Sequence, residues 1–428
     1  MLIDFTVKNF LSIKDEMVLS AETGERLSRL KETNTVKNNF SSLLKSLIIV
    51  GPNGSGKSNL IQALNLMKTM VLNDPESVTN RLRYQPFALN QFSENYPTQF
   101  ETTFSYSEYT YRYSFEYNAD EITSENLAIL TKPSSKINET IYFSRDHQNF
   151  LVIPDNLKSL VTKTRPNSLF LFNAQQANDE HAINVTKWFQ NDLMFVDNLQ
   201  MTDQFANLIR NDKIKNEFLR FLHFADFNII NVKAREIPLP DFPEQFKKAL
   251  AMLDQTVNLP TSAKELFTVH HQYNDSGDVV ADQEIPLSME SKGTQKIFLI
   301  ALSIISAQLD GDRKTLLFDE FDDSLHFELS KALLQIFNSK QNKNQFILTT
   351  HELQLLDTDL RTDQIYLMEK DFQGRSDLKS VFDFKDSRKN ARADVKFMKK
   401  YIEGRFGAFP QVQVGEMLNA LDASQNDN

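Results

Sequence analysis

Several features that mark particular classes of protein are absent from this chain. None of its 428 residues is cysteine, which excludes disulfides and thiolate-bound metal or redox centres and is typical of a reducing cytosol. Its longest apolar stretch, residues 297–309, is interrupted by serines and is too short to span a bilayer. The first residues lack the basic flank and apolar core of a secretion signal. We therefore expect a cytoplasmic protein with no membrane contact.

Positive charge is also scarce. The 47 Lys and Arg residues are outnumbered by 57 Asp and Glu residues, so the net charge is −10 and the pI is near 5.3. Sequence-independent nucleic-acid binding depends on neutralising phosphates with cations, so this balance argues against such a coat. One basic cluster lies within residues 385–400, and a solvated helix face is the favoured interpretation over a binding patch. Its members are Lys385, Arg388, Lys389, Arg392, Lys396, Lys399 and Lys400.

The first third of the chain contains strand patterns around one helix. Residues 1–10 alternate apolar and polar side chains, and residues 17–20 are expected to pair with them. Residues 100–117 alternate strongly and are rich in aromatics, which predicts an antiparallel hairpin that residues 140–145 extend. The continuous apolar run 46–50 is typical of a buried parallel strand. Helical periodicity follows over residues 58–70.

The rest of the chain indicates an inserted lobe and a return to the same α/β core. Residues 157–253 are mostly helical in pattern, and residues 267–285 predict a second hairpin. An apolar helix is expected at 294–309 and buried strands at 315–318, 345–349 and 365–368, the last being the final strand. We predict an α/β P-loop fold with a mixed or parallel sheet, an antiparallel β-lobe and a mostly helical insertion. The expected segments are 1–150, 151–285 and 286–428.

Residues 51–58 match the phosphate-binding pattern G-x-x-x-x-G-K-[ST] at every fixed position, between the predicted strand and helix. Glycines let backbone N–H groups close around phosphates, and the helix N-terminus adds a favourable dipole. Lysine supplies a point charge at the β- and γ-phosphates, and the serine hydroxyl reaches Mg²⁺. We therefore predict an ATP and Mg²⁺ site; its nucleotide-binding residues are Gly51, Pro52, Asn53, Gly54, Ser55, Gly56, Lys57, Ser58 and Asn59, and Ser58 is also a metal ligand.

Three polar residues follow two further predicted strands. Asp319 and Glu320 end the strand at 315–318, where a carboxylate can hold Mg²⁺ and its neighbour can polarise an attacking water. Acidic residues at a strand end are also common as turn residues, but the P-loop favours the catalytic interpretation. His351 follows the strand at 345–349, and we predict that it contacts the γ-phosphate.

Ser291 and Gly293 directly precede the apolar helix at 294–309. A serine cap and a glycine at a helix start form a second anion-binding end. Serine and glycine are also routine capping residues, but one chain already contains a complete P-loop, so this second end suggests a site that another copy completes.

The order of these motifs resembles the ATPase head of the ABC/SMC class. More narrowly, the chain is similar to the stand-alone ABC-type ATPases of bacterial anti-phage and abortive-infection systems, the RloA/AbiLi-like group, which are distant relatives of OLD-family ATPases and of SMC-like DNA-repair heads. The narrower resemblance rests on residues 5–10 with Ser12, and on residues 290–294, 322–326 and 401–410. It covers both ends of the chain well and the middle poorly.

The resemblance implies a role for each matching residue. Ser291 and Gly293 contact the γ-phosphate of the opposite subunit, Asp319 serves Mg²⁺, Glu320 orients the hydrolytic water and His351 is the switch residue. Residues 324–326 then form the D-loop, with His326 where transporters have Asp. Gln85 is the candidate for the Q-loop and a further metal ligand.

The resemblance also implies partners. ATP would drive head-to-tail homodimerisation, and the dimer would sense infection or restrain a separately encoded effector, a toxin or nuclease from a neighbouring gene. A nucleic acid or a phage component is the expected trigger. The alternatives are an SMC-like DNA-binding repair ATPase, and an ATP-bound scaffold that neutralises a toxin with little turnover. Too few residues follow His351 for the nuclease domain of OLD-type proteins.

Two further patterns favour structural roles. His270 and His271 are adjacent on a predicted strand, so they point to opposite faces and no third ligand is evident. The tyrosines between Tyr106 and Tyr117 could stack on bases, but the same alternation is what a packed β-lobe requires.

Overall fold

The computed structural model describes residues 1–24, 27–38, 40–132, 136–196, 203–225, 228–238, 262–311, 313–384, 397–404, 414–415 and 418. The chain divides into two compact units. Unit 1 comprises Met1–Phe195, Arg313–Asp322 and Ser330–Asn428, and unit 2 comprises Val196–Asp312 and Asp323–Leu329. These limits differ from the predicted segment boundaries at residues 150 and 285.

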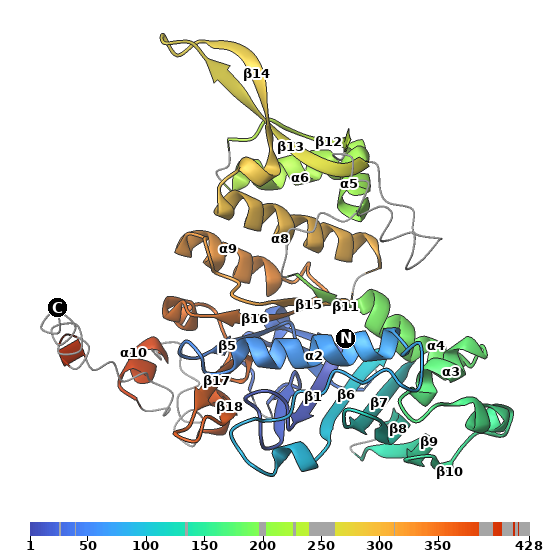
Figure 1. The fold of residues 1–428 in the computed structure, drawn as a ribbon. Helices are drawn as coiled ribbons and strands as arrows, with labels where there is room; N and C mark the ends of the chain where they lie inside the picture. The colour runs from blue at the N-terminus through green and yellow to red at the C-terminus, as the bar shows by residue number, and fades with distance from the viewer. Residues whose placement is uncertain are drawn as a thin grey trace, which may run out of the picture. The chain divides into compact units, whose positions relative to one another are not determined.

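The β-lobe of unit 1 is a seven-stranded antiparallel sheet in the order β10-β9-β8-β7-β6-β1-β2 (Figure 1). The predicted pairing of the first two strands and the predicted aromatic hairpin are both confirmed. Strand β9 joins the hairpin through β8, which the sequence pattern did not predict. The strands are β1 (Leu2–Lys8), β2 (Met17–Ser20), β6 (Thr98–Tyr106), β7 (Tyr109–Tyr117), β8 (Ile122–Thr131), β9 (Asn138–Asp146) and β10 (Asn149–Val152).

A second sheet of unit 1 contains the P-loop strand. Its order is β11-β15-β16-β5-β17-β18, with neighbours parallel except for β18, which runs antiparallel to β17. The prediction that residues 365–368 form the final strand is therefore wrong, because β18 follows β17. The members are β5 (Ser46–Val50), β11 (Leu193–Phe195), β15 (Thr315–Phe318), β16 (Gln345–Thr350), β17 (Ile365–Lys370) and β18 (Ser376–Ser380).

One hydrophobic core serves both sheets of unit 1. Strand β5 is buried at every residue, as its continuous apolar run predicts. Helix α2 (Lys57–Leu72) packs on β1 and β6 of the β-lobe (Figure 1). Gln345 of β16 links the two sheets, because its Oε1 accepts from the Leu2 N–H at 3.0 Å and its Nε2 donates to the Leu2 carbonyl at 3.1 Å. The P-loop is therefore held between two sheets that share a core.

Short elements complete unit 1. They are α1 (Lys31–Asn34), β3 (Thr35–Lys37), β4 (Ser42–Leu44), the 3-10 helices η1 (Ser93–Asn95), η2 (Asp155–Lys163), η5 (Leu353–Asp357), η6 (Thr362–Gln364) and η7 (Val381–Asp383), the helices α3 (Phe170–Gln176), α4 (Glu180–Lys187) and α10 (Phe397–Ile402), and the π-helical turn η3 (Trp188–Asp192). Helix α9 (Phe327–Phe337) belongs mostly to unit 1, and its first three residues are counted with unit 2.

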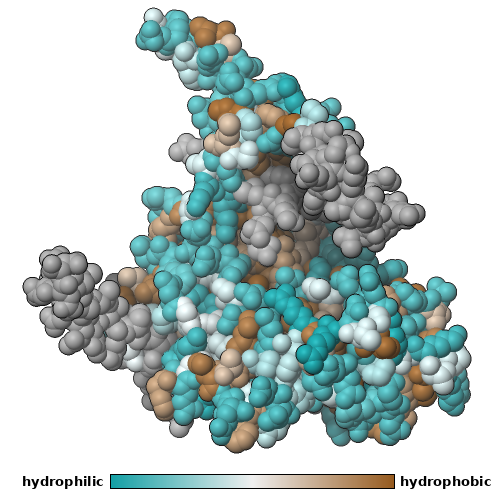
Figure 2. Space-filling view, in the orientation of Figure 1, coloured by the Kyte–Doolittle hydropathy of each residue, from teal (hydrophilic) through white to brown (hydrophobic). Residues whose placement is uncertain are grey.

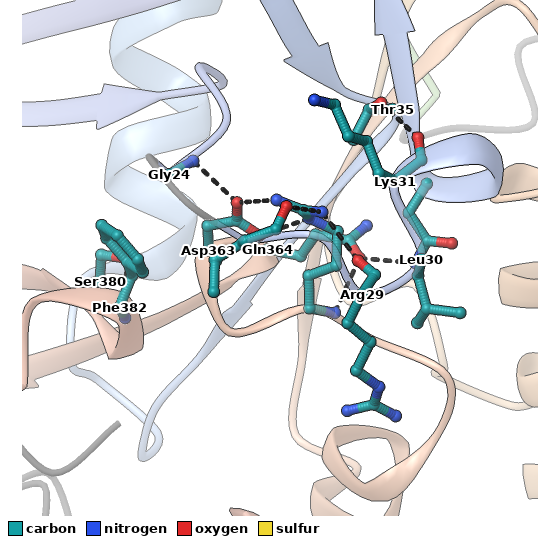
Figure 3. Close-up of polar contacts among 12 residues, drawn as sticks. Gly24, Arg29, Leu30, Lys31, Thr35, Asp363, Gln364, Ser380 and Phe382 are labelled. Carbon is teal, nitrogen blue, oxygen red and sulfur yellow. Dashed lines mark hydrogen bonds and ion pairs between the residues drawn. The ribbon is translucent and has the colours of Figure 1, made fainter. Parts of the chain in front are cut away.

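A buried polar cluster fixes Gly24 and Arg29 to the P-loop sheet. The Asp363 carboxylate accepts from the Gly24 N–H at 2.8 Å and pairs with Arg361, which also donates to the Arg29 carbonyl (Figure 3). Gln364 donates to the Ser46 carbonyl at the start of β5. A cluster of this kind is structural, because each polar group in it has a protein partner.

Unit 2 combines helices with a small sheet. Strand β12 (Asn231–Pro238) pairs with β13 (Ser262–Tyr273), which pairs with β14 (Val279–Pro286), all antiparallel. The predicted hairpin is confirmed, and β12 was not predicted. The helices are α5 (Asp203–Arg210), α6 (Asp212–Phe224), η4 (Leu287–Met289) and α8 (Lys292–Leu309). Figure 2 shows apolar atoms at the end of the hairpin, where Val279 and Val280 are exposed.

Candidate functional site

The P-loop connects β5 to α2 in the strand–loop–helix arrangement that the motif requires. Gly54 and Gly56 adopt φ values of +74° and +110°, which side-chain-bearing residues rarely adopt. Gly51 has no room for a side chain, because a Cβ there would lie 2.2 Å from the Met368 carbonyl oxygen. The backbone of the loop therefore depends on glycine at three places.

Lys57 bonds to the backbone of its own loop. Its Nζ donates to the carbonyls of Gly51 at 2.8 Å and Pro52 at 3.1 Å. Burial lowers the pKa of Lys57 to about 8, although the carboxylates of Asp319 and Glu320 favour the charged form. The ammonium is thus poorly solvated, and an incoming phosphate would find it already desolvated.

The loop also contains a buried hydroxyl group that a phosphate could satisfy. Ser55 Oγ is buried and has no hydrogen-bond partner among the described residues. A buried polar atom left without a partner is costly and indicates a ligand or water. Asn53 and Gly54 are exposed at the tip of the loop, and Ser58 is half-buried at the start of α2. The Asn59 side chain turns instead to Ser12, donating to its Oγ at 2.7 Å.

Two serines that are distant in sequence contact the loop, Ser376 of β18 and Ser12 of the turn between β1 and β2. Ser376 Oγ donates to the Ser55 carbonyl at 2.6 Å and lies 2.7 Å from Ser12 Oγ, from which it can accept. The Ser376 N–H also donates to the Ser12 carbonyl. Both hydroxyls lie close to Gly56, because a Cβ there would be 2.2 Å from Ser376 Oγ and 2.8 Å from Ser12 Oγ. Sequence patterns gave no indication of Ser376.

Asp319 and Glu320 follow β15 and are both held by Thr349 of the neighbouring strand β16. Thr349 Oγ1 donates to Asp319 Oδ1 at 2.5 Å and accepts from the Glu320 N–H at 2.8 Å. Asp319 is half-buried and Glu320 is exposed. Glu320 has a φ of +48°, in the left-handed region. The sequence predicts both acidic residues, but it does not reveal Thr349.

His351 and Asp322 belong to the same electrostatic neighbourhood. Partial burial and the positive charge of Lys57 lower the pKa of His351, while Asp322, Glu320 and Asp319 oppose this shift. His351 is therefore neutral at pH 7, where its ring can both donate and accept. Asp322 Oδ1 is buried without a hydrogen-bond partner among the described residues. The structure thus brings Lys57, Asp319, Glu320 and His351 together and adds Asp322.

The predicted signature residues lie in unit 2, at the start of α8. Ser291 Oγ accepts from the Thr294 N–H at 3.1 Å and so caps the helix. Gly293 lies against the carbonyl of Ser324, since a Cβ there would be 2.6 Å from that oxygen. Ser291 is exposed, so its hydroxyl is accessible to a ligand. Glu290, immediately before it, accepts from Thr268 Oγ1 and contacts His270 Nε2 at 2.7 Å.

Two other predicted residues have local partners. Gln85 Oε1 accepts from Arg83 Nε at 3.1 Å, and the Gln85 carbonyl accepts from the N–H of Leu11, next to Ser12. His326 Nδ1 accepts from the Glu328 N–H at 3.3 Å near the start of α9. Neither of these side-chain bonds reaches the P-loop. Their roles as Q-loop and D-loop residues stay predictions.

The structural interpretations of the remaining patterns agree with the geometry. His270 contacts Glu290 and His271 contacts the exposed Asp282, and the described residues contain no group of three or more metal-binding side chains. Tyr111, Tyr113 and Tyr117 are buried in the β-lobe core. The basic cluster lies outside the described residues except for Lys399 and Lys400 at the end of α10.

A comparison with protein families gives a match to the part of the chain that holds the site. The sequence model described as "AAA domain, putative AbiEii toxin, Type IV TA system" matches residues 46–357, which hold the P-loop, the acidic pair and His351. The chain belongs to this family. The AAA-domain protein thus has the ATPase domain of this family, and its P-loop, acidic pair and His351 lie within the matched residues. Proteins of the P-loop class use a nucleotide and Mg²⁺.

Solved structures provide a more distant comparison for this AAA-domain protein. The SMC head domain from Thermotoga maritima is 15% identical, with a TM-score of 0.38, and the match covers 89% of this chain and 98% of that one. An SMC head bound to the C-terminal winged-helix domain of ScpA is 14% identical, with a TM-score of 0.40 and coverages of 91% and 99%. A search of curated proteins gives no match.

The AAA-domain protein offers no helical route across a membrane in the part of the chain that the structure describes. No helix there is both long enough and apolar enough to span a bilayer.

Proposed function

We propose that this AAA-domain protein binds ATP with Mg²⁺ and hydrolyses it. The observation that supports this most directly is the convergence of Lys57, Asp319 and Glu320, since each contributes to the electrostatics of one site. Lys57 binds the β- and γ-phosphates, and Ser58 and Asp319 hold Mg²⁺, which neutralises developing charge on the phosphates. Gln85 is a third proposed metal ligand. Glu320 accepts a proton from the attacking water.

His351 serves as a neutral hydrogen-bonding partner of the γ-phosphate. Its lowered pKa supports this role, because a neutral imidazole can donate to a phosphate oxygen without adding a second buried cation beside Lys57. Ser55 Oγ, which has no hydrogen-bond partner among the described residues, donates to a phosphate oxygen. The loop thus exchanges internal bonds of Lys57 for bonds to ATP.

The second half of each site comes from another copy of the chain. Ser291 is exposed at the N-terminus of an eighteen-residue helix, an arrangement that favours anions. In a head-to-tail homodimer, Ser291 and Gly293 of one subunit would contact the γ-phosphate bound by the P-loop of the other. ATP binding would close this dimer and hydrolysis would release it.

The biological role that fits these properties is regulation of a separate effector in bacterial anti-phage defence. The matched family is described by a putative abortive-infection toxin and a toxin–antitoxin system. In this proposal the cytoplasmic ATPase senses infection and controls a toxin or nuclease encoded next to it. A phage challenge comparing wild type with Lys57→Ala, expressed with the neighbouring gene, tests the role. Equal protection by both would contradict it.

A complementation experiment tests the shared site. Lys57→Ala and Ser291→Arg should each abolish turnover when purified alone. Mixing them creates heterodimers in which one site has both lesions and the other has neither, so roughly a quarter of wild-type turnover should return. No recovery on mixing, with both proteins folded and wild type active, would show that the P-loop does not use the signature of a second copy.

A trapping experiment tests hydrolysis and assembly together. Glu320→Gln removes the proton acceptor but retains the size of the side chain, so it should bind ATP, stop turnover and accumulate as a dimer. Light scattering after size-exclusion chromatography, with ATP and with ADP, measures this. A variant that still hydrolyses ATP at the wild-type rate would remove Glu320 from the catalytic role.

Two alternatives give different results in the same assays. An SMC-like DNA-binding repair ATPase would show turnover strongly stimulated by DNA, which the net charge of −10 argues against. An ATP-bound scaffold would dimerise with nucleotide and neutralise its toxin without measurable turnover.

A further inference from the structure

We propose that Thr349 is a positioning residue of the hydrolytic site, whose single hydroxyl aligns the Asp319 carboxylate and the Glu320 backbone together. The inference rests on the proposed ATP hydrolysis and goes beyond it, because Thr349 belongs to none of the motifs that define the site. It touches neither nucleotide nor water in this scheme and acts through the two acidic residues.

Strand register brings Thr349 level with the acidic pair. Strands β15 and β16 run parallel, and their last paired residues are Phe318 and Leu348. The next residue on each strand is therefore Asp319 on one side and Thr349 on the other. Thr349 is completely buried, so its hydroxyl has no access to water and must bond within the protein.

The hydroxyl makes two bonds of opposite sense. Thr349 Oγ1 donates to Asp319 Oδ1 at 2.5 Å and accepts from the Glu320 N–H at 2.8 Å. A hydroxyl can do both at once, since it holds one donor hydrogen and two lone pairs. The Thr349 carbonyl accepts a third bond, from the Phe321 N–H at 2.9 Å. One residue thus anchors three successive residues of the turn after β15.

The turn needs such an anchor because its backbone is unusual. Glu320 has a φ of +48°, which a residue with a side chain adopts only when its surroundings impose it. The bond from the Glu320 N–H fixes this conformation and hence the direction of the Glu320 side chain. The bond to Asp319 fixes the rotation of that carboxylate, which would otherwise turn about its own axis. Threonine suits this role, because its β-branch restricts the rotation of the hydroxyl itself.

Thr350 provides a matched control on the same strand. It is also completely buried, and its Oγ1 accepts from the Glu352 N–H at 2.9 Å, beyond the strand. This bond leads to the segment after β16 and not to the turn after β15. The two threonines share burial, strand and side chain but have different partners.

The first test compares Thr349→Val, Thr349→Ser and Thr350→Val in the full chain. Outer-shell partners of metal-binding carboxylates are worth about 10- to 100-fold in activity or metal affinity, so Thr349→Val should lower kcat by that factor. Thr349→Ser should retain most of the activity, and Thr350→Val should match wild type. A Thr349→Val enzyme with wild-type kcat would overturn the proposal, and so would an equal loss in Thr350→Val.

The second test does not depend on turnover. Electron paramagnetic resonance of Mn²⁺, with a non-hydrolysable ATP analogue bound, measures metal affinity directly. Thr349→Val should weaken Mn²⁺ binding about 10-fold, while metal-free nucleotide affinity stays unchanged. Unchanged Mn²⁺ affinity would overturn the proposal. If wild type shows no ATP turnover at all, the proposed function fails, but this measurement still decides the role of Thr349.

A double-mutant cycle separates positioning from general damage to the fold. Once Asp319→Asn has removed the carboxylate, Thr349→Val should cost little further Mn²⁺ affinity, because residues in contact are not additive. Fully additive losses would show that Thr349 acts through overall stability. If Thr349→Val does not fold, Thr349→Ala removes the same hydroxyl with less crowding and takes its place in all three tests.

Discussion

Ser376 Oγ donates a 2.6 Å hydrogen bond to the Ser55 carbonyl, so a side chain from β18 holds the backbone of the P-loop. The same hydroxyl occupies the space in which a side chain at Gly56 would lie. Gly56 is therefore required for two separate reasons, its φ of +110° and the nearness of Ser376. Gly54, with a φ of +74°, has open space around the position of a Cβ.

These two glycines provide a matched pair of substitutions. Gly54→Ala should cost only the left-handed backbone strain, about 1–2 kcal/mol. Gly56→Ala should cost more, because the new methyl group also displaces Ser376 and Ser12. Urea unfolding followed by the fluorescence of Trp188, the single tryptophan, measures both in unit 1. Nucleotide affinity should follow the same order.

A second substitution identifies the cause. Ser376→Gly removes the closest atoms from the path of the methyl group, so it should recover part of the stability lost in Gly56→Ala. Equal destabilisation by Gly54→Ala and Gly56→Ala, with no recovery, would show that backbone strain alone accounts for the requirement.

Nucleotide affinity should depend on pH through Lys57. Its pKa is about 8, and phosphates at Nζ would raise it. Binding therefore favours the protonated form. Affinity should be constant below pH 8 and should weaken above it, by up to about tenfold per pH unit. Titration with a fluorescent ATP analogue between pH 6.5 and 9.5 measures this dependence.

Lys57→Met is the control for the pH dependence. It should bind nucleotide more weakly at every pH and should show no inflection near pH 8. A wild-type affinity that stays constant up to pH 9.5 would contradict the lowered pKa.

The ion pair between Arg145 and Glu125 should dominate the stability of the β-lobe. Both side chains are fully buried and lie 2.7 Å apart, and Glu125 also accepts from Tyr113 and from the first N–H groups of α3. Arg145→Met leaves Glu125 buried without its cation and should destabilise unit 1 by about 3–5 kcal/mol. Trp188 fluorescence during urea unfolding reports it.

The exposed pair of Arg81 and Asp120 is the comparison. Arg81→Met should change stability by about 0.5 kcal/mol or less, because exposed ion pairs are well solvated. Similar losses of stability in the two variants would mean that burial does not increase the contribution of the Arg145 ion pair to the free energy of unfolding.

Glu290 should stabilise the hairpin and the start of α8 together. Glu290 directly precedes the Ser291 cap, and its side chain contacts Thr268 and His270 of β13. Glu290→Ala removes the carboxylate that both side chains contact, so the local opening free energy should fall by about 1–3 kcal/mol. Hydrogen exchange in β13 and the first turn of α8 measures the change.

Asp282→Ala tests the specificity of this effect. Asp282 pairs with His271 on the opposite, exposed side of the same strand. It should leave exchange in α8 unchanged. Faster exchange in α8 of Asp282→Ala, or unchanged exchange in α8 of Glu290→Ala, would show that the Glu290 contact does not specifically stabilise the helix start.

The sequence predicts the P-loop and its flanking elements because their determinants are local. The apolar run of β5, the glycines and Lys57 lie within a few residues of one another, and Gly54 and Gly56 have the backbone angles that the motif requires. Asp319, Glu320 and His351 are also recognisable, since each follows a short buried strand.

Residues that act through sheet order are not recognisable in the same way. Thr349 has the composition of any buried β-branched strand residue, and only the parallel pairing of β15 with β16 brings it to Asp319. Ser376 reaches the P-loop because β18 pairs antiparallel with β17, which the sequence pattern placed last. Strand β12 has too many charged residues for a clear alternation, and long-range pairing with β13 determines it.

The position of β5 in its sheet has a consequence for synthesis of the chain. Its two neighbours, β16 and β17, are translated about three hundred residues later, so the nascent strand emerges long before its partners. Until then an apolar segment rich in β-branched residues has unpaired edges, which is the composition of an aggregation-prone sequence. Closure of the sheet must therefore be a late, non-local step, and slow folding is expected of such contacts. A ribosome-associated chaperone that covers residues 46–50 should therefore raise the yield of folded protein and leave the rate of synthesis nearly unchanged.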